Sequence, residues 1–527
     1  MSSETPSPLE TALRAAMMKS EWTEVISMIE TNWTLLTRTN QGLLVDAVNA
    51  LPPSILAKNP RLSAARTYVN YLPVNGDVRP IRFLHAPAAA PGALLDVLAD
   101  LTSRSVSARF DGNLSEAVRF VREALATLED ASDEAVAAIR PVLPDIRVQW
   151  AITFELAGEL VDANRLYERT FDEALAVENR RIAIKSAGSI ALNYALAGNR
   201  LAAEQWLNRE PPAVATGTDA TEHSPLDTVR TTGGLARALL AANDLRLSEA
   251  AEFLRLAPPS DVDRETWALR LYVESGLARA SGVARQQLMA VKSTLATQPE
   301  RHRTTGLNGW LATTAIAELQ LSLGDVAAAH ETIKQLGAYD PLTAVDPARV
   351  LRAWVALRRG DARGSILIAA PGLSQPLSSS RVTAELLVAL AAASLAVDQL
   401  EDARRHFSSA MEIVVTEKLD IVLLRLSAAE RAILLADLPA DLETRVLAEF
   451  DAHESVATAP LSVVLTKREK VVLRYIVQGL TPTEIAEAEH VSRNTVKAQV
   501  RSLYRKLGVN DSAAALRAAV STPHLLA

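Results

Sequence analysis

Apolar residues recur at intervals of three and four positions along most of the chain, from about residue 10 to residue 450. This spacing is typical of helices that bury one face. Alternating runs of β-branched residues, which would indicate strands, are hardly present. The pattern therefore predicts an all-α body.

A short motif repeats along this body, in which Gly or another turn-forming residue is followed five positions later by a small residue, usually Ala. The Gly ends one helix in the left-handed conformation, and the small residue lets the next helix pack closely against it. The eight candidate turns are about 41 residues apart on average. They are Gly112, Gly158, Gly198 and Gly324, the weaker Asp398, and the less certain Asn243, Gly282 and Gly360.

Helix pairs of this kind cannot bury their faces alone and must stack on one another. The body therefore resembles a solenoid of tetratricopeptide-type repeats, although its period exceeds the roughly 34 residues of the standard unit. An irregular helical bundle remains the alternative interpretation.

Segments rich in turn-forming residues interrupt the predicted solenoid at Pro73 to Gly92, Pro211 to Pro225 and Pro371 to Ser380. They either shape a binding surface on one face or are tolerated surface loops. A fourth segment, Ala452 to Pro460, connects the body to the C-terminal part of the chain and is predicted to be a protease-sensitive linker.

The last sixty residues contain the start and stop signals of short helices. Thr466 with Glu469, and Thr481 with Glu484, have the spacing of capping boxes. Pro482 occupies the favoured first position of the second helix, and Gly479 and Gly508 are stop signals for the first and third helices.

A third, longer helix is predicted to begin after a tight turn at His490 and Val491, with Ser492 as its cap. Its Val496, Val500, Leu503 and Leu507 form an apolar stripe. The opposite side is polar and cationic, with Asn494, Lys497, Ala498, Arg501 and Arg505. A helix with one packing face and one cationic face, preceded by a shorter helix, is the arrangement of a helix-turn-helix.

The distribution of charge supports this interpretation. The 527 residues carry a formal net charge of −7, but the segment from Leu461 onward carries +5 and the remainder −12. An acidic body joined to a small basic segment indicates that the C-terminal segment binds a polyanion.

The segment from Leu465 to about Val520 resembles the LuxR-type (GerE-like) four-helix DNA-binding domain, and SRNTVKAQVRSLYRKLGV resembles the maltose-regulator (MalT) branch of that family. The stretch from Gly42 to Val69 is similar to the start of the helical-repeat arm of those regulators. Their usual ATPase module has no counterpart here, because the chain contains no GxxxxGK[ST] phosphate loop.

The resemblance implies three regions: a helical-repeat sensor or interaction domain in residues 1–451, a linker in 452–463, and the DNA-binding domain in 464–527. It implies that Lys497 and Arg501 contact bases or adjacent phosphates, that Ala498 contacts a base edge, and that Thr495 and Arg505 contact the backbone. Arg493 and Asn494 belong to the same predicted DNA-binding face. The helix from Ala513 to Val520 would form the dimer contact on DNA, through Ala515 and Ala519.

Two positions depart from the family pattern. Glu489 stands where a leucine usually seats the second helix, and we expect its carboxylate to be exposed or paired with a cation, because an unpaired buried carboxylate is costly. Gln499 replaces a usual histidine.

Other functions receive little support. The chain has no cysteine, no HExxH, GxGxxG or GxSxG motif, and eight histidines without ligand spacing, so we expect no enzyme activity, metal or cofactor. The seven tryptophans all lie in the body, as core residues or as part of a ligand groove. With no signal peptide and no bilayer-spanning apolar run, a cytoplasmic location is expected.

Two functions remain. The first is a sequence-specific transcriptional regulator that binds promoter DNA as a dimer, with a solenoid that senses an unidentified small molecule or protein. The second is a protein-interaction scaffold whose basic C-terminal domain has no regulatory role.

Overall fold

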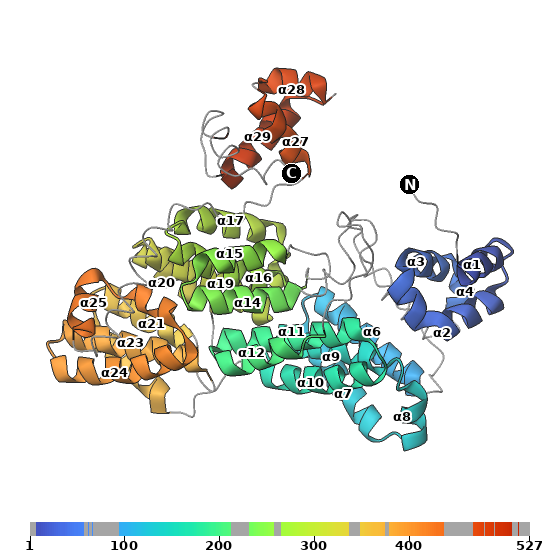
Figure 1. Ribbon diagram of the computed structural model, residues 1–527, viewed down its shortest axis with the longest axis horizontal. Coiled ribbons are helices and arrows are strands. Elements are labelled where there is room, and N and C mark those ends of the chain that lie inside the picture. The colour runs from blue at the N-terminus through green and yellow to red at the C-terminus, as the bar shows by residue number, and fades with distance from the viewer. Residues whose placement is uncertain are drawn as a thin grey trace.

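The computed structural model describes residues 7–56, 62, 66, 94–211, 231–257, 265–336, 348–374, 379–436, 467–478, 480–489, 491–507 and 515. Every regular element in these ranges is a helix, which confirms the all-α prediction (Figure 1). None of them combines the length and the hydropathy that are required to cross a bilayer.

In chain order the elements are α1 (Pro8–Met18), α2 (Trp22–Thr39), α3 (Gln41–Ala50), α4 (Pro53–Leu56), α6 (Leu94–Phe110), α7 (Leu114–Glu129), α8 (Asp133–Ile139), α9 (Leu143–Ala157), α10 (Leu160–Ala176), α11 (Arg180–Ala197), α12 (Arg200–Arg209), α14 (Thr231–Asn243), α15 (Leu247–Leu256), α16 (Trp267–Ala280), α17 (Ala284–Thr297), α18 (Glu300–Thr304), α19 (Gly306–Ser322), α20 (Val326–Lys334), α21 (Ala348–Arg358), α22 (Ala362–Ala369), the 3-10 helix η2 (Ala370–Ser374), α23 (Ser380–Ala396), α24 (Leu400–Glu417), the 3-10 helix η3 (Asp420–Arg425), α25 (Ala428–Leu435), α27 (Lys467–Val477), α28 (Pro482–Ala488) and α29 (Arg493–Leu507).

Helices α1 to α4 pack around a small core of their own, which includes Leu13, Val25 and Leu44. The segment that resembles the start of a regulator arm, Gly42 to Val69, contributes most of α3 and all of α4 to this unit. The rest of that segment lies outside the described residues, apart from Leu62 and Arg66.

From α6 to α24 the helices form antiparallel pairs, and the predicted turns lie between the two helices of each pair. Seven of the eight predicted turn positions have positive φ, including Gly158 at 86° and Asp398 at 59°. At the eighth, Asn243 is the last residue of α14, and Leu245 adopts the positive φ of 53°. The helical-repeat prediction is therefore confirmed, with one turn two residues later than expected.

The alanines five positions after the clearest of these turns are buried, as the motif predicts. Each lies in the first turns of the second helix of its pair, where a methyl group is the largest side chain that allows close approach. The alanines of the clearest motifs are all 0% exposed: Ala117, Ala163, Ala203, Ala329 and Ala403.

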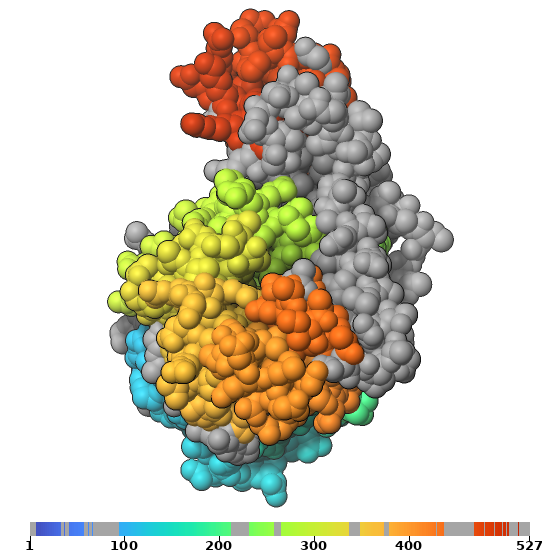
Figure 2. Space-filling view, turned by 90° about the vertical axis from the view of Figure 1, so that its left-hand side faces the viewer, coloured from blue at the N-terminus to red at the C-terminus, as the bar shows by residue number. Residues whose placement is uncertain are grey.

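The stacked pairs wind back on themselves, so pairs far apart in sequence come into contact. Helix α9 contacts α19, and α11 contacts α23. In Figure 1 the teal pairs α9 to α12 lie below the green helices α14 to α19, with the orange helices α21 to α25 beside them. Figure 2 shows the green, yellow and orange pairs as one continuous surface.

Two turn glycines lie at these contacts. A Cβ on Gly112 would be 2.6 Å from Cβ of Arg301, and one on Gly198 would be 2.7 Å from the backbone nitrogen of Arg381. Both distances are shorter than real Cβ contacts allow. Glycine is therefore required at each position for two reasons: its backbone has positive φ, and the next layer of helices approaches too closely for a Cβ atom.

The predicted interruptions are only partly described. The third is shorter than predicted, since η2 covers Ala370–Ser374 and α23 begins at Ser380. The segment 73–92, most of 211–225 and the predicted linker 452–463 lie outside the described residues.

Candidate nucleic-acid interface and a polar seam in the repeats

Helices α27, α28 and α29 enclose a separate hydrophobic core at the C-terminal end of the chain. Leu473 of α27, Ile485 of α28, and Val496 and Leu503 of α29 are each 0% exposed. The apolar stripe that the sequence predicts on the third helix therefore faces this core. Val500, the next residue of the stripe, is partly buried against the same core. Leu507 belongs to α29, but its side chain lies outside the description.

The start of α28 has the predicted capping box. The backbone N–H of Thr481 donates to Oε2 of Glu484 at 2.7 Å, and the N–H of Glu484 donates back to Oγ1 of Thr481 at 3.4 Å. The Thr481 N–H, together with the Thr481 hydroxyl that donates to the same oxygen at 2.8 Å, holds the pKa of the Glu484 carboxyl below its usual range. Together with Pro482 at the helix start, these bonds fix where the second helix begins.

The turn into α29 is fixed by Ser492, as predicted. The N–H of Thr495 donates to Oγ of Ser492 at 3.1 Å, and the two hydroxyl groups are 2.7 Å apart. The other predicted capping box is only half described, because Thr466 lies outside the described residues. Its second member, Glu469, is 5% exposed.

The solvent face of α29 is cationic. Arg493, Asn494, Lys497 and Arg501 are all exposed, as is Thr495 beside them. Within the described part of the chain no carboxylate forms an ion pair with Arg493, Lys497 or Arg501. Their charges are therefore available to phosphate groups. Ala498 and Arg505 lie on the same helix, but their side chains lie outside the description.

The two residues predicted for the dimer contact differ in what can be said of them. Ala515 is 0% exposed and belongs to the core shared by α27, α28 and α29. Its methyl group is thus enclosed by its own domain and is not on the domain surface. Ala519 lies outside the described residues.

The two departures from the family pattern both have accessible side chains. Glu489 follows the last residue of α28 and is exposed, as the cost of burying a carboxylate predicts. Gln499 is half-buried.

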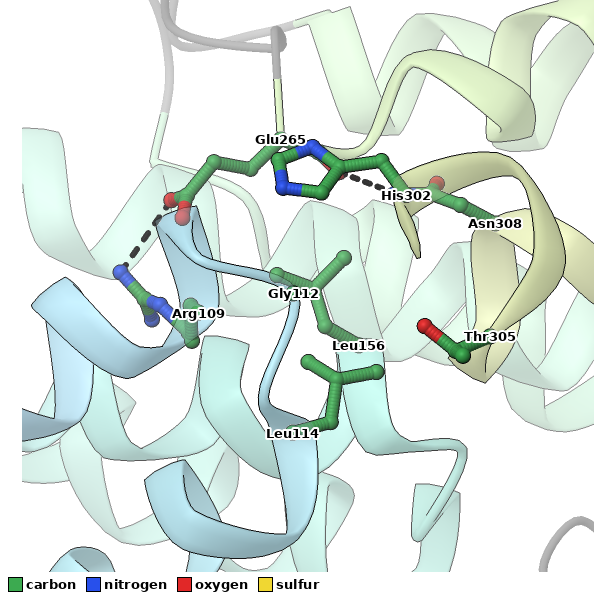
Figure 3. Close-up of a pocket in the computed structure, with 8 residues that line it drawn as sticks. All are labelled: Arg109, Gly112, Leu114, Leu156, Glu265, His302, Thr305 and Asn308. Carbon is green, nitrogen blue, oxygen red and sulfur yellow. Dashed lines mark hydrogen bonds and ion pairs between the residues drawn. The ribbon is translucent and has the colours of Figure 1, made fainter. Parts of the chain in front are cut away.

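A second polar region, which we call the seam, lies where the first helix pair, α6 and α7, meets the fifth pair, α16 and α17, and the sixth pair, α19 and α20. Figure 3 shows a recess there between Gly112 and Leu114 on one side and His302, Thr305 and Asn308 on the other. It leaves about 30 Å³ of free space. Since a buried water needs about half of that volume, the recess has room for water but not for a metabolite.

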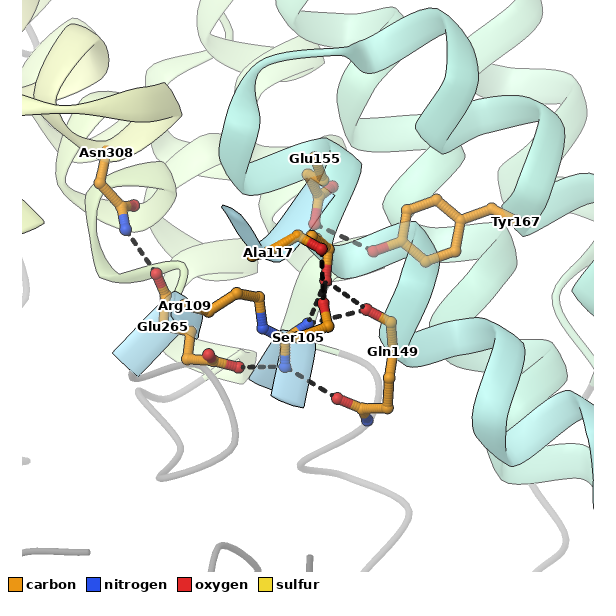
Figure 4. A network of polar contacts seen from close by, with 9 residues as sticks. Ser105, Arg109, Ala117, Gln149, Glu155, Tyr167, Glu265 and Asn308 are labelled. Atoms are coloured by element: carbon orange, nitrogen blue, oxygen red, sulfur yellow. Dashed lines mark hydrogen bonds and ion pairs between the residues drawn. The ribbon is translucent and has the colours of Figure 1, made fainter. Parts of the chain in front are cut away.

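Arg109 is the centre of the polar network beside this recess (Figure 4). Its side chain is fully buried, and its Nη2 donates to Oε2 of Glu265 at 3.1 Å and to Oε1 of Gln149 at 2.9 Å. Its Nη1 donates to the carbonyl of Gln149 at 2.8 Å and to Oγ1 of Thr153 at 3.2 Å. A single guanidinium therefore joins α6 to α9 and to Glu265, two residues before the start of α16.

Further bonds close the seam. Nδ2 of Asn308 donates to the carbonyl of Glu265, and Nε2 of His302 lies 2.7 Å from the carbonyl of Phe110. Close to Arg109, the Tyr167 hydroxyl donates to Glu155 at 3.0 Å, and burial raises the pKa of Tyr167 well above its usual value. Sequence reasoning missed all of these residues, because nothing local to Arg109 signals a partner 156 positions away.

Comparison with known proteins bears on the C-terminal helices. Residues 463–519 match the family described as bacterial regulatory proteins of the LuxR family (GerE). Over 62 residues the chain is 45% identical to the probable transcriptional regulatory protein NarL of Mycobacterium tuberculosis, in strain CDC 1551 / Oshkosh and in strain H37Rv. That alignment covers 12% of this chain and 29% of the length of those relatives.

Proposed function

We infer that this protein is a transcriptional regulator, on the premise that residues 463–519 form a LuxR-family helix-turn-helix domain. One observation carries the inference: α29 exposes Arg493, Lys497 and Arg501 without carboxylate partners among the described residues, on the side opposite its buried stripe. A helix of this kind enters the major groove of DNA, where its N-terminal residues reach base edges and phosphates.

In this proposal the residues of α29 have distinct roles. Lys497 and Arg501 reach base edges or the adjacent phosphates, and Arg493 and Asn494 hold the start of the helix against the backbone. Thr495 and Arg505 contact the backbone as well, and Ala498 contacts a base edge. Contacts to phosphates position the helix, whereas contacts to bases supply the sequence preference.

Two copies of the domain bind one site in this proposal, because a single short helix reads only a few base pairs. The contact between copies is assigned to the segment from Ala513 to Val520, with Ala519 as a candidate. Since Ala515 is enclosed in the core of its own domain, another face of this segment has to meet the partner copy. The repeats would sense a small molecule or a protein and transmit its presence to the DNA-binding domain.

Selection of binding sites from random DNA tests the proposal. The full chain should enrich an imperfect inverted repeat with half-sites about 10 base pairs apart or closer. The double variant Lys497→Ala/Arg501→Ala should enrich nothing. Arg285→Ala/Arg363→Ala, which removes two exposed charges from α17 and α22, is the matched control and should enrich the same repeat as the unmodified chain.

The scaffold interpretation predicts a different result. If the unmodified chain enriches no sequence, or binds all sequences equally, the C-terminal domain is not a sequence-specific reader. The repeats would then remain as the functional part of the chain.

A further inference from the structure

A cluster of charged side chains is buried inside the repeats, away from the seam and from the DNA-binding helices. It consists of Arg279 at the end of α16, Glu318 on α19, Arg381 and Glu385 on α23, and Arg425 in η3. No side chain among them is more than 9% exposed. Four elements that are separate in sequence therefore meet at one enclosed set of charges.

The carboxylates are shared among the arginines. Nη2 of Arg425 lies 2.9 Å from Oε1 of Glu318 and 3.4 Å from Oε2 of Glu385. Nη1 of Arg381 lies 3.5 Å from Oε1 of Glu385, and Arg381 also donates to Asn243. Arg425 therefore hydrogen-bonds to both carboxylates, whereas Oε1 of Glu385 is buried with only the longer ion pair to Arg381.

Arg279 is left with the weakest partners. Among the described residues, its one ion pair joins Nη1 to Oε2 of Glu318 at 3.7 Å, beyond hydrogen-bond distance. Its Nε and Nη1 are buried and have no hydrogen-bond acceptor in the described part of the chain. Burial lowers the pKa of Arg279, yet a guanidinium keeps its proton at neutral pH. The charge is therefore present and poorly compensated.

The sum of charges in the cluster is positive. Among the described residues, three guanidinium groups face two carboxylates, and the titratable neighbour Tyr272 does not supply a third negative charge to balance them. Burial, followed by the nearby Glu318 carboxylate, raises the pKa of Tyr272 to about 12, so its hydroxyl is neutral at physiological pH. An enclosed positive charge without a counter-ion is costly, which favours an anion from outside the chain.

We propose that Arg279 binds the oxyanion group, carboxylate or phosphate, of a small metabolite. Planar guanidinium donors match the oxygens of these groups, and two donors of Arg279 have no other acceptor. The site would connect α16, α19, α23 and η3 through one ligand. This proposal rests on the sensor role proposed for the repeats and gives that role a ligand class.

Thermal unfolding of the full chain tests the site without DNA, so its outcome is independent of the DNA-binding proposal. Sodium phosphate and sodium acetate are titrated at constant ionic strength, with chloride as the replaced ion. We expect one of the two oxyanions to raise Tm in a saturable way, because a ligand that binds only the folded state stabilises it. Which of them does so distinguishes a phosphate ligand from a carboxylate ligand.

Arg279→Met removes the uncompensated charge and keeps much of the side-chain volume. It should abolish the saturable rise in Tm while leaving the protein without oxyanion at least as stable as the unmodified chain. A purely structural Arg279 would give the opposite result, a lower Tm without oxyanion. The control Arg285→Met, at an exposed position of α17, should respond as the unmodified chain does.

Arg279→Lys provides a second variant if the methionine variant does not fold. It keeps the charge but has fewer donors, and we expect its half-saturating oxyanion concentration to rise about tenfold. A flat Tm in phosphate and in acetate for the unmodified chain would overturn the proposal. So would an unchanged response in Arg279→Met, or in Arg279→Lys if only that variant folds.

Discussion

The hydroxyl group of Tyr475 on α27 donates a hydrogen bond of 2.9 Å to Oε1 of Glu489, directly after α28. The bond and the negative charge of Glu489 raise the pKa of Tyr475. A position that usually holds an apolar residue in LuxR-type domains thus makes a polar tie between the supporting helix and the turn that precedes α29.

Tyr475→Phe should weaken DNA binding by a few-fold while the fold is kept, because the half-buried ring is retained, Glu489 is exposed, and only the placement of α29 is affected. Affinity for the selected site, measured by fluorescence anisotropy alongside far-UV circular dichroism, checks this. Glu489→Gln retains an acceptor for the tyrosine and should bind normally. Loss of affinity in Glu489→Gln but not in Tyr475→Phe would mean that the charge of Glu489, and not the hydrogen bond, matters.

The cationic face of α29 makes a prediction about salt. Removing a phosphate contact lowers the slope of log affinity against log salt concentration by about one, and weakens all sequences alike. Removing a base contact costs about 1–3 kcal/mol on the selected site and relaxes preference at one position. Lys497→Ala and Arg501→Ala should each show one of these results. If a variant shows no change in salt slope and no change in affinity for the selected site, the face that contacts DNA lies elsewhere.

The seam predicts a large effect from a single buried residue. Arg109→Ala leaves the Glu265 carboxylate, whose side chain is 9% exposed, without its guanidinium partner in a buried setting. Losing one member of a buried ion pair typically costs about 3–5 kcal/mol. Urea unfolding should show a loss of this size. The exposed Arg104 pairs with Asp100 at 3.5 Å, and Arg104→Ala should cost less than about 1 kcal/mol.

The repeat turns predict where the array does not tolerate added volume. Ala163→Leu places three further carbon atoms at a position that is 0% exposed, and overpacking of this kind costs about 1–3 kcal/mol. The control Val161→Leu, on the same helix and 56% exposed, should change the free energy of unfolding little. Similar losses in the two variants would mean that α10 is disturbed as a whole and that the close approach at Ala163 is not the cause.

Local signals were sufficient to predict much of this molecule from its sequence. Gly158 and Ser492 determine their own backbone surroundings, so a turn and a cap could be assigned from a few neighbouring letters. The turn at Leu245 could not be assigned in this way, because a branched residue such as leucine gives no turn signal in the sequence, and the nearby Asn243 was the better candidate.

Contacts between distant parts of the chain could not be predicted in this way. Arg109 and Glu265 form a buried pair only because the array winds back, and the winding depends on small rotations summed over several helix pairs. Ala515 lies in an alanine-rich segment that suggests a helix contact at the surface. Its burial depends on where the preceding three helices leave a gap, which the local sequence does not show. The same holds for Arg279. Its lack of a full set of partners becomes evident only when the charged groups around it in the fold are counted.

The close approaches at Gly112 and Gly198 change how the repeats should unfold. In an open array each unit touches only its neighbours, and melting proceeds like a one-dimensional chain that frays from its ends. Here a unit is also fastened to one almost two hundred positions further along, as the 2.7 Å approach of His302 to Phe110 illustrates. Loosening one layer therefore releases another, and the body should melt as a cooperative block, with amide protons in α9 and α19 exchanging together.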